Sequence, residues 1–382
     1  MPVRVVLLVA PVLATALAGG LVVGAPAANA GPHPRAASVV NMTPPVVDGT
    51  PQVGARLTAE PGTWQPPEAT FSYRWLRDGD PVPGAVERRY VPVPRDVGRQ
   101  LAVRVTGASG GFVDGVATSE SVTITQGTLV AEKPPTIDGS RRYGHTLVAR
   151  HGSWNQAPDR FRYHWLRNGR PIKGARGPRH ALGLADFGER ISVEVSAVKD
   201  GYRREVVTSG QTVRIAHRVP TRHTVTYHVE TRGQIVADLG LFKKQAQQTF
   251  DDPRGWRGSG VAFRRVARGG SFTLVLSEAS QVPTFSPVCS AQWSCRVGRF
   301  VIINQTRWRN ASPMWNQVHR SLRDYRHMVV NHETGHWLGW GHRTCPGRGT
   351  AAPVMQQQSK GLEGCRANPW PTPAERRVPR FS

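Results

Sequence analysis

Short alternations of apolar and polar residues fill the first half of the chain. In residues 71–75, Phe-Ser-Tyr-Arg-Trp, the aromatic side chains occupy every second position, which places them on one face of a strand. Asp78-Gly79 follows this strand, and such a pair favours a hairpin turn. Residues 101–105, Leu-Ala-Val-Arg-Val, alternate in the same way. Short strands separated by frequent turn residues predict a β-sandwich.

The same pattern occurs twice. Three segments recur ninety positions later with similar side chains: 62–64 at 152–154, 73–79 at 163–169, and 96–98 at 186–188. The repeat predicts two copies of one module, at residues 42–126 and 132–216. Trp75 and Trp165 take equivalent strand positions and are expected in the two cores; exposed aromatic side chains that bind a glycan are the alternative. Each copy resembles the cysteine-free immunoglobulin-like repeats of bacterial surface proteins, which implies two all-β immunoglobulin-like sandwiches that serve as a spacer or a docking arm.

Beyond residue 220 the pattern mixes strands with helices. We expect strands at residues 225–229, 261–266, 272–276 and 299–304, and helices at residues 236–250 and 315–338. The second helix is predicted from apolar residues at helical spacing, among them Val318, Leu322 and Val329. A sheet followed by a long helix predicts an α+β domain at residues 221–382, so we expect a multidomain chain.

Residues 332–342 have the spacing of a metal site. On a helix, His332 and His336 lie one turn apart, so both imidazoles leave the same face and can bind one ion. Gly339 can adopt a positive φ, which ends the helix and lets His342 return as a third ligand. Three protein ligands leave a fourth position open for water, which favours a catalytic zinc site over a closed structural one. Glu333 lies beside the first ligand without being one; a chance pair of helical histidines is the alternative.

These positions resemble the long zinc signature of the metzincin metallopeptidases, H-E-x-x-H-x-x-G-x-x-H. The family places a methionine in a turn beneath the metal, and Met355 lies at a matching place, although an ordinary buried methionine fits the position equally. Some metzincins carry a tyrosine two residues later that stabilises the oxyanion. Here that position is Gln357, an amide that can donate a hydrogen bond but need not reach. A weaker stabiliser costs ~10²–10³ in rate.

Residues 221–373 further resemble a family of secreted actinobacterial domains of uncharacterised function that carry the same signature. The resemblance rests on residues 252–256 (Asp-Pro-Arg-Gly-Trp), 331–333 (Asn-His-Glu), 355–358 (Met-Gln-Gln-Gln) and 368–371 (Asn-Pro-Trp-Pro). It implies a metzincin-like fold and leaves the substrate open.

The metzincin resemblance implies a zinc-dependent endopeptidase. One zinc ion would activate a water molecule, and Glu333 would act as the general base and pass the proton to the leaving amine. An extended polypeptide substrate is expected to pair with a sheet edge, for which we expect residues 300–304. The alternative is a binding or adhesive protein of the cell wall whose zinc is structural and non-catalytic. A third hypothesis is cleavage of peptide bonds within the cell wall.

All four cysteines lie in the last third of the chain. An even number in an exported protein argues for two disulfides. Their order suggests that Cys289 pairs with Cys295, and Cys345 with Cys365 around Met355. Cys345 as a fourth metal ligand is the alternative, and it would close the open coordination position.

The first thirty residues predict a signal peptide. Arg4 precedes an apolar run at residues 5–23, and Ala28-Asn29-Ala30 has the pattern of a cleavage site. An uncleaved membrane anchor is the alternative, since the run is nearly long enough to span a bilayer. With residues 1–30 removed, we expect a linker at residues 31–41 and a secreted protein without a membrane segment, free or associated with the cell wall.

The chain is strongly basic, with 50 Lys and Arg against 26 Asp and Glu, a net charge of +24. Such a charge raises nucleic acid as a partner. The basic residues are scattered over the chain and are not gathered in one stripe, so we expect a solvated surface and no nucleic-acid site. Attraction to anionic cell-wall polymers is the weaker hypothesis.

Overall fold

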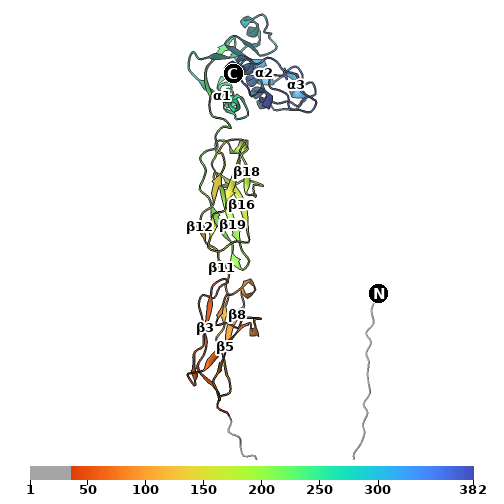
Figure 1. Cartoon of the computed structure of the whole chain (residues 1–382). Helices are drawn as coiled ribbons and strands as arrows, with labels where there is room; N and C mark the ends of the chain where they lie inside the picture. The colour runs from red at the N-terminus through yellow and green to blue at the C-terminus, as the bar shows by residue number, and fades with distance from the viewer. Residues whose placement is uncertain (1–35) are drawn as a thin grey trace, which may run out of the picture. The chain divides into compact units, whose positions relative to one another are not determined.

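The computed structural model describes residues 36–382, which are mostly β-sheet with few helices (Figure 1). The predicted signal peptide at residues 1–30 lies outside the described residues, as do residues 31–35 of the predicted linker. The chain divides into two compact units, the first ending at Thr125 and the second beginning at Gln126. No helix within residues 36–382 is both long enough and apolar enough to cross a membrane.

The first unit consists of short strands and one 3₁₀ turn. They are β1 (Val40–Thr43), β2 (Val46–Asp48), β3 (Leu57–Glu60), β4 (Thr63–Gln65), β5 (Thr70–Arg77), β6 (Asp80–Pro81), β7 (Arg89–Tyr90), η1 (Pro94–Asp96), β8 (Gln100–Ala108), β9 (Gly115–Thr118) and β10 (Val122–Thr123). One sheet has the order β2-β3-β7, and a second has the order β10-β8-β5-β6, with β9 also paired to β8. Trp75 on β5 is fully buried, and its indole N–H donates to the carbonyl of Glu87 at 2.9 Å.

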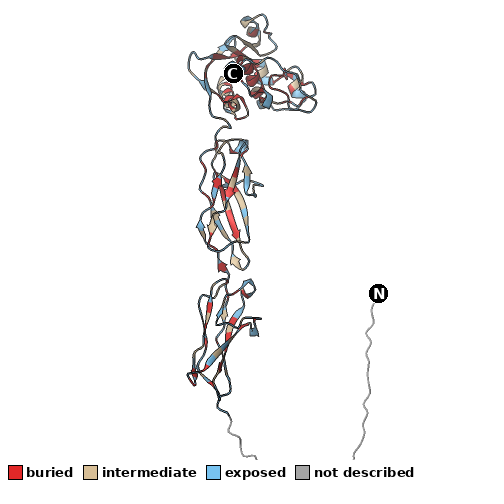
Figure 2. Cartoon of the chain, viewed as in Figure 1, coloured by how far each residue is buried: buried red, intermediate tan, exposed pale blue. Residues whose placement is uncertain are grey.

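The second unit begins with a similar arrangement. Its strands are β11 (Gly127–Thr128), β12 (Ala131–Lys133), β13 (Thr136–Asp138), β14 (Thr146–Arg150), β15 (Ser153–Trp154), β16 (Arg160–Arg167), β17 (Arg170–Pro171), β18 (Arg179–Ala181), β19 (Ile191–Val198), β20 (Tyr202–Arg203) and β21 (Glu205–Thr208), with the 3₁₀ turn η2 (Leu184–Asp186). Its two larger sheets have the orders β13-β14-β18 and β17-β16-β19-β21, and β11-β20 and β12-β15 form two-stranded sheets. Trp165 is fully buried and donates to the carbonyl of Gly177 at 2.9 Å, as Trp75 does to Glu87. Buried positions along the strands of this repeat are red in Figure 2. Both tryptophans are core residues, as expected.

A five-stranded sheet forms the centre of the remaining residues. Its strands are β22 (His223–Arg232), β23 (Val261–Arg265), β24 (Phe272–Ser277), β25 (Cys295–Val297) and β26 (Phe300–Asn304), in the order β23-β22-β24-β26-β25. The first four strands in this order pair in parallel, and β25 is antiparallel to β26. Every residue of β24 is buried, which is typical of a parallel strand covered on both faces.

Four helices accompany this sheet. They are α1 (Leu239–Asp251), α2 (Gln305–Asn310), α3 (Pro313–Gln317) and α4 (Leu322–Trp337), with the 3₁₀ turns η3 (Trp256–Ser259), η4 (Ala279–Phe285), η5 (Pro373–Glu375) and η6 (Pro379–Phe381). The ring of Trp337 on α4 lies 5.0 Å from that of Phe272 on β24, between centroids. The indole N–H of Trp256 donates to the backbone carbonyl of Asn331 at 3.0 Å. These buried contacts fix α4, which carries two of the three predicted metal ligands, His332 and His336.

The single helix expected at residues 315–338 is two helices, α3 and α4. Between them His319 takes a φ of 52°, which an α-helix does not accommodate. Ser321 then caps α4, because its hydroxyl accepts from the N–H of Asp324 at 3.0 Å. The prediction of one continuous helix was wrong, since apolar spacing continues across a break that only the backbone reveals.

The two edges of the sheet are β23 and β25, and the expectation of an edge at residues 300–304 was wrong. That segment is β26, which lies inside the sheet between β24 and β25. A tight turn containing Gly298 lets β25 fold back and pair antiparallel with β26. A disulfide from Cys289 to Cys295 ties the first residue of β25 to the preceding loop.

Candidate metal centre

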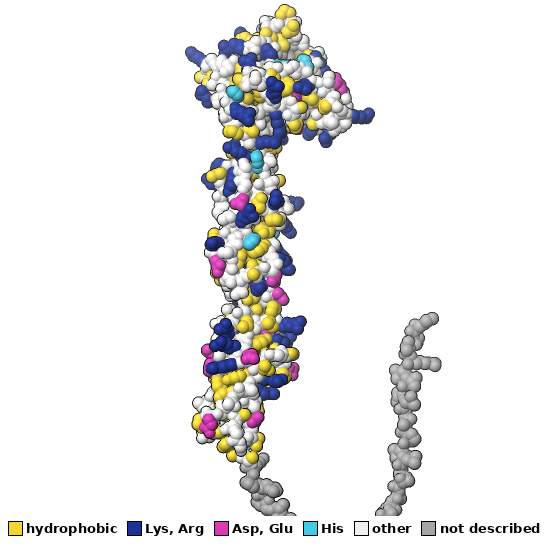
Figure 3. Space-filling view, viewed as in Figure 1, with side chains coloured by type: hydrophobic (Ala, Val, Ile, Leu, Met, Phe, Trp, Pro, Cys, Tyr) yellow, Lys and Arg dark blue, Asp and Glu magenta, His cyan; other side chains and the backbone are white. Residues whose placement is uncertain are grey.

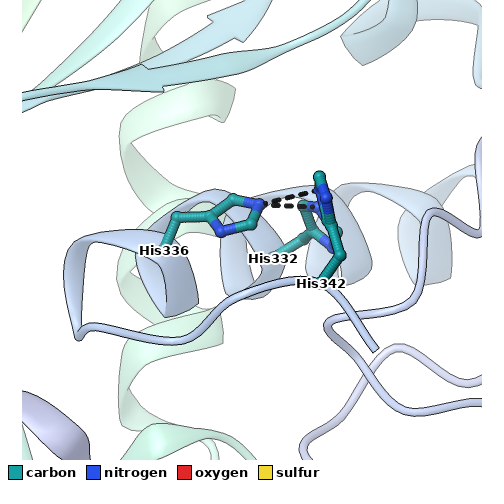
Figure 4. Close-up of side chains that lie close together, drawn as sticks. All are labelled: His332, His336 and His342. Atoms are coloured by element: carbon teal, nitrogen blue, oxygen red, sulfur yellow. Dashed lines mark hydrogen bonds between the residues drawn. The ribbon is translucent and has the colours of Figure 1, made fainter. Parts of the chain in front are cut away.

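The second half of α4 presents two histidines on one face. His332 and His336 lie one turn apart, and both rings point to the side where the chain returns after the helix (Figure 4). Gly339 follows the helix with a φ of 96°, a conformation that glycine adopts at little steric cost. The returning chain then places His342 beside the other two rings. The structure therefore brings the three predicted ligands together.

The three imidazoles approach one another through their Nε2 atoms. The Nε2 atom of His336 lies 3.2 Å from that of His332 and 3.2 Å from that of His342. In tetrahedral geometry, nitrogen atoms bound to zinc at ~2.0–2.1 Å lie about 3.3 Å apart. The observed spacing fits one metal ion held by three nitrogens.

The outer nitrogens of two rings fix their tautomers. The Nδ1 atom of His332 lies 2.8 Å from the carbonyl oxygen of Val354, and that of His336 lies 2.9 Å from the carbonyl oxygen of Trp340. Because a carbonyl oxygen only accepts, each Nδ1 carries the proton and each Nε2 keeps its lone pair. Two such lone pairs at 3.2 Å repel unless a cation lies between them. Burial, followed by repulsion from His336, lowers the pKa of His332 to about 3, so its ring is neutral, as a metal ligand must be.

Met355 packs against the helix that carries two of these ligands. It is fully buried, and its side chain lies against α4 at Gly335. A Cβ atom on Gly335 would collide with the sulfur of Met355 and the ring of Trp256. Gly335 is one of the two unspecified positions between His332 and His336 in H-E-x-x-H, so the sequence pattern did not single it out. Its missing side chain lets Met355 approach the helix.

Glu375 holds the turn that contains Met355, and sequence reasoning missed it. Its carboxylate is fully buried and accepts from the backbone N–H groups of Val354 at 3.0 Å and Met355 at 2.9 Å. It also accepts from the N–H and the hydroxyl of Thr372, both at 2.8 Å. The signal available in the sequence was Thr372-Pro373-Ala374-Glu375, which has the capping-box pattern.

Glu333 lies in the cleft beside the histidines. Its side chain is only 6% exposed, and burial raises its pKa to about 8, an effect that the positive charge of Arg296 partly opposes. A metal cation nearby would favour the ionised carboxylate and lower this pKa. Glu333 therefore lies beside the three histidines in surroundings that favour its protonated form when no cation is near.

A cleft of about 610 Å³ contains the three histidines and Glu333. Tyr325, Met328 and Val329 of α4 are buried side chains that form its apolar part. The disulfide-closed loop before β25 and the edge strand itself provide further lining. Gln357 also lines the cleft, so the predicted oxyanion stabiliser faces the same space as Glu333.

Both predicted disulfides are present. Cys289 is bonded to Cys295, and Cys345 to Cys365. Cys345 is therefore not a metal ligand, and the alternative of a sulfur in the fourth coordination position is wrong. The second disulfide closes the segment that contains Met355.

Residues 199–373 match a family described as "Protein of unknown function (DUF3152)". No curated protein matches the chain. Similar solved structures include three N-terminal domains of the outer capsid protein Hoc of bacteriophage RB49, with 13% identity, 49% of this chain and 65% of that chain covered, and a TM-score of 0.23. A Ca²⁺-stabilized adhesin with which an Antarctic bacterium binds ice has 10% identity, coverages of 48% and 52%, and a TM-score of 0.22. A two-domain fibronectin type-III segment of chicken tenascin has 14% identity, coverages of 44% and 98%, and a TM-score of 0.23.

The chain spans less than two-thirds of the phage and adhesin structures, at 65% and 52%. All three TM-scores are too low for these likenesses to bear on the fold or function of this chain.

Proposed function

We propose that residues 221–382 form a secreted zinc-dependent endopeptidase with a metzincin-like α+β fold, carried on two immunoglobulin-like sandwiches. The observation that carries the proposal is the convergence of three Nε2 atoms beside a buried carboxylate in an open cleft. The placement of Met355 under α4 supports the metzincin-like fold. A purely structural metal site would gain nothing from Glu333 at its edge, so this residue favours catalysis.

His332, His336 and His342 would hold the ion. When bound, zinc supplies a Lewis acid that polarises the scissile carbonyl and lowers the pKa of water. Glu333 accepts the proton of the attacking water and later delivers it to the nitrogen of the leaving amine as the C–N bond breaks. The open edge of β25 orients an extended substrate by backbone hydrogen bonds, and the apolar cleft wall excludes bulk water around Glu333.

The test uses the purified full chain and its Glu333→Gln variant with a mixed peptide library. We expect the parent to cleave peptides only when zinc is present, and the variant to bind zinc but to cleave about 10²–10⁴-fold more slowly. Glu120→Gln, an exposed change in the first repeat, is the control and should cleave at the parent rate. Equal inactivity of parent and variant, with zinc bound to both, would contradict the proposal and favour a structural zinc site.

A second candidate function is attachment to anionic cell-wall polymers through the second repeat. The basic excess is not shared by the two repeats: residues 42–126 hold 8 basic and 9 acidic side chains, whereas residues 132–216 hold 16 and 8. Figure 3 shows basic side chains outnumbering acidic ones on the visible face of the second repeat. The contrast favours a polyanion as partner of the second repeat alone.

The contrast is sharpest in the segment that links β17 to β18. Arg170, Lys173, Arg176 and Arg179 are all exposed there. The equivalent positions of the first repeat are Asp80, Pro83, Val86 and Arg89, on a segment with the same pattern of turns. Among residues 36–382, none of the four basic side chains of the second repeat forms an ion pair.

This candidate is tested with immobilised poly(glycerol phosphate). The full chain carrying Arg170→Asp and Arg176→Val, which introduce the side chains found at the equivalent positions Asp80 and Val86 of the first repeat, should bind at least about tenfold more weakly in low salt. The control carries Arg89→Asp and Arg95→Val, the same change of charge on exposed positions of the first repeat. Equal loss in both variants would mean that only net charge matters and would remove the second repeat as a docking site.

A further inference from the structure

The cleft contains two cationic side chains without an acidic partner. Arg296 comes from the edge strand β25, and Lys360 follows the turn that contains Met355. None of the ion pairs found among residues 36–382 involves either of them. Glu333 is the one acidic residue among those that line the cleft, and the proposed function assigns it to proton transfer. The cleft is therefore electropositive before any zinc is bound, and its shape focuses this field.

The two cations differ in how far they are engaged. The guanidinium of Arg296 donates to the backbone carbonyl of His336 at 2.7 Å, so it is held against the end of α4. Lys360 is anchored through its backbone, whose N–H donates to the carbonyl of Gln357 at 2.8 Å. Its ammonium group makes no hydrogen bond within the described part of the chain. Lys360 is thus the cation that remains available to a ligand.

Lys360 also lies at a boundary between two spaces. Besides the main cleft, it lines an adjoining pocket of about 210 Å³ that is bounded by His342, Gln357 and Glu363. Glu363 forms no ion pair with Lys360 across this pocket within residues 36–382, and its carboxylate lies 3.4 Å from the backbone N–H of Cys345. Lys360 therefore lies beside His342, on the rim between the candidate metal centre and a second pocket large enough for a short side chain.

We propose that Lys360 makes the site selective for peptides that carry a carboxylate next to the scissile bond. The inference rests on the proposed function, because it assigns a substrate class to the same cleft. The carboxylate belongs either to an acidic side chain or to the C-terminus of a short peptide. Lys360 is exposed in the free chain, but a bound peptide covers it within a cleft whose wall includes the buried side chains of Tyr325 and Met328. An ion pair formed in the covered cleft is screened less than one in open solvent, and a basic substrate residue is repelled.

Binding to the Glu333→Gln full chain, loaded with zinc, tests this inference without requiring turnover. The probes are dye-labelled alanine hexapeptides with a blocked C-terminus. They come in pairs that differ only in having Glu or Gln at one position, and separate pairs place this residue at each position of the peptide. A third probe has no acidic side chain but a free C-terminus. Since zinc itself attracts carboxylates, each probe is measured against the chain with and without the additional change Lys360→Gln. Lys244→Gln, an exposed change of equal charge on α1, is the matched control.

We expect at least one acidic probe to bind about tenfold more tightly than its neutral partner, and this preference to disappear in Lys360→Gln but not in Lys244→Gln. If only the free C-terminus gives the preference, the substrate carboxylate is terminal; if the Glu probe gives it, the carboxylate is a side chain. A preference that survives Lys360→Gln, equal affinity for acidic and neutral probes, or no binding at all would overturn the inference. If the parent chain cleaves no peptide but the preference is retained, the proposed function is wrong, and Lys360 selects a carboxylate in binding without a reaction.

Discussion

His332 and Glu375 are connected through a single residue. The carbonyl of Val354 accepts from Nδ1 of His332 at 2.8 Å, and the N–H of the same residue donates to the carboxylate of Glu375 at 3.0 Å. Glu375 is fully buried, and it lies more than thirty positions after the last metal ligand in the sequence. The orientation of the first metal ligand therefore depends on a carboxylate that never reaches the ion.

Replacing Glu375 by Gln should weaken zinc binding. The amide keeps the shape of the side chain, but its nitrogen cannot accept from Val354 and Met355. We expect a loss of about 10–100-fold in zinc affinity, the range found when a residue that supports a metal ligand is changed. Competition with a fluorescent chelator measures it, with Glu120→Gln as the control. Unchanged affinity in a folded Glu375→Gln chain would show that the turn holds His332 without this carboxylate.

Gly335→Ala should destabilise the domain that carries the metal centre. The new methyl group would enter the space of the Met355 sulfur and the Trp256 ring, and overpacking of this kind costs about 1–3 kcal/mol. Gly341→Ala is the control, because no atom lies within 4 Å of the added carbon there. Urea unfolding of both variants gives the comparison. Because Met355 is fully buried, Met355→Ala is itself destabilising, but the double change Gly335→Ala with Met355→Ala should cost less than the sum of the two single changes. Strict additivity would mean that Met355 is not the obstacle.

Asp186 should stabilise the second repeat in a pH-dependent way. Burial raises the pKa of this carboxyl, but hydrogen bonds from His180, Arg167 and the N–H of Gly183 outweigh burial and hold the pKa below its usual value. A depressed pKa in the folded state means that the stabilisation is complete above the unfolded value of about 3.9 and is lost as the pH falls through the folded value. The stability difference between the parent and Asp186→Asn should therefore be large at pH 7 and should shrink at the acid end.

Urea unfolding, followed by hydrogen exchange at the backbone N–H of Trp165, which donates to the carbonyl of Ala175 at 3.1 Å, measures this difference at several pH values. The folded environment of Trp165 reports on the same repeat, since its ring lies 5.4 Å from that of His180 between centroids. A difference that stays constant from neutral pH down to pH 3 would contradict the assigned role of Asp186.

The sequence could predict the ligands because their spacing is a direct consequence of helix geometry. His332 and His336 follow from one turn of helix, and Gly339 from the need to reverse the chain before His342. The two tryptophan cores followed in the same way from period-two alternation. The cysteine pairing followed from chain order, and both bonds are present.

Other features could not be predicted because they depend on contacts between distant segments. The edge strand β25 is three residues long, too short for a periodic signal, and it is defined by its pairing with β26. The helix breaks at His319 because this residue has a positive φ of 52°, while the apolar spacing continues across it. Glu375 has a local capping pattern, but its bonds to Val354 and Met355 join residues 21 and 20 positions apart in the chain. Lys360 stands out only once the cleft shows which of the many basic residues lack a partner.

X-ray absorption at the zinc edge on the purified full chain shows whether three imidazoles hold one catalytic ion with an open position. We predict one zinc per chain, with scattering from three imidazole nitrogens and one oxygen at ~2.0–2.1 Å, and loss of one imidazole in His342→Ala. A chain that binds no zinc, or a spectrum with sulfur at ~2.3 Å or with four protein ligands, would contradict the account.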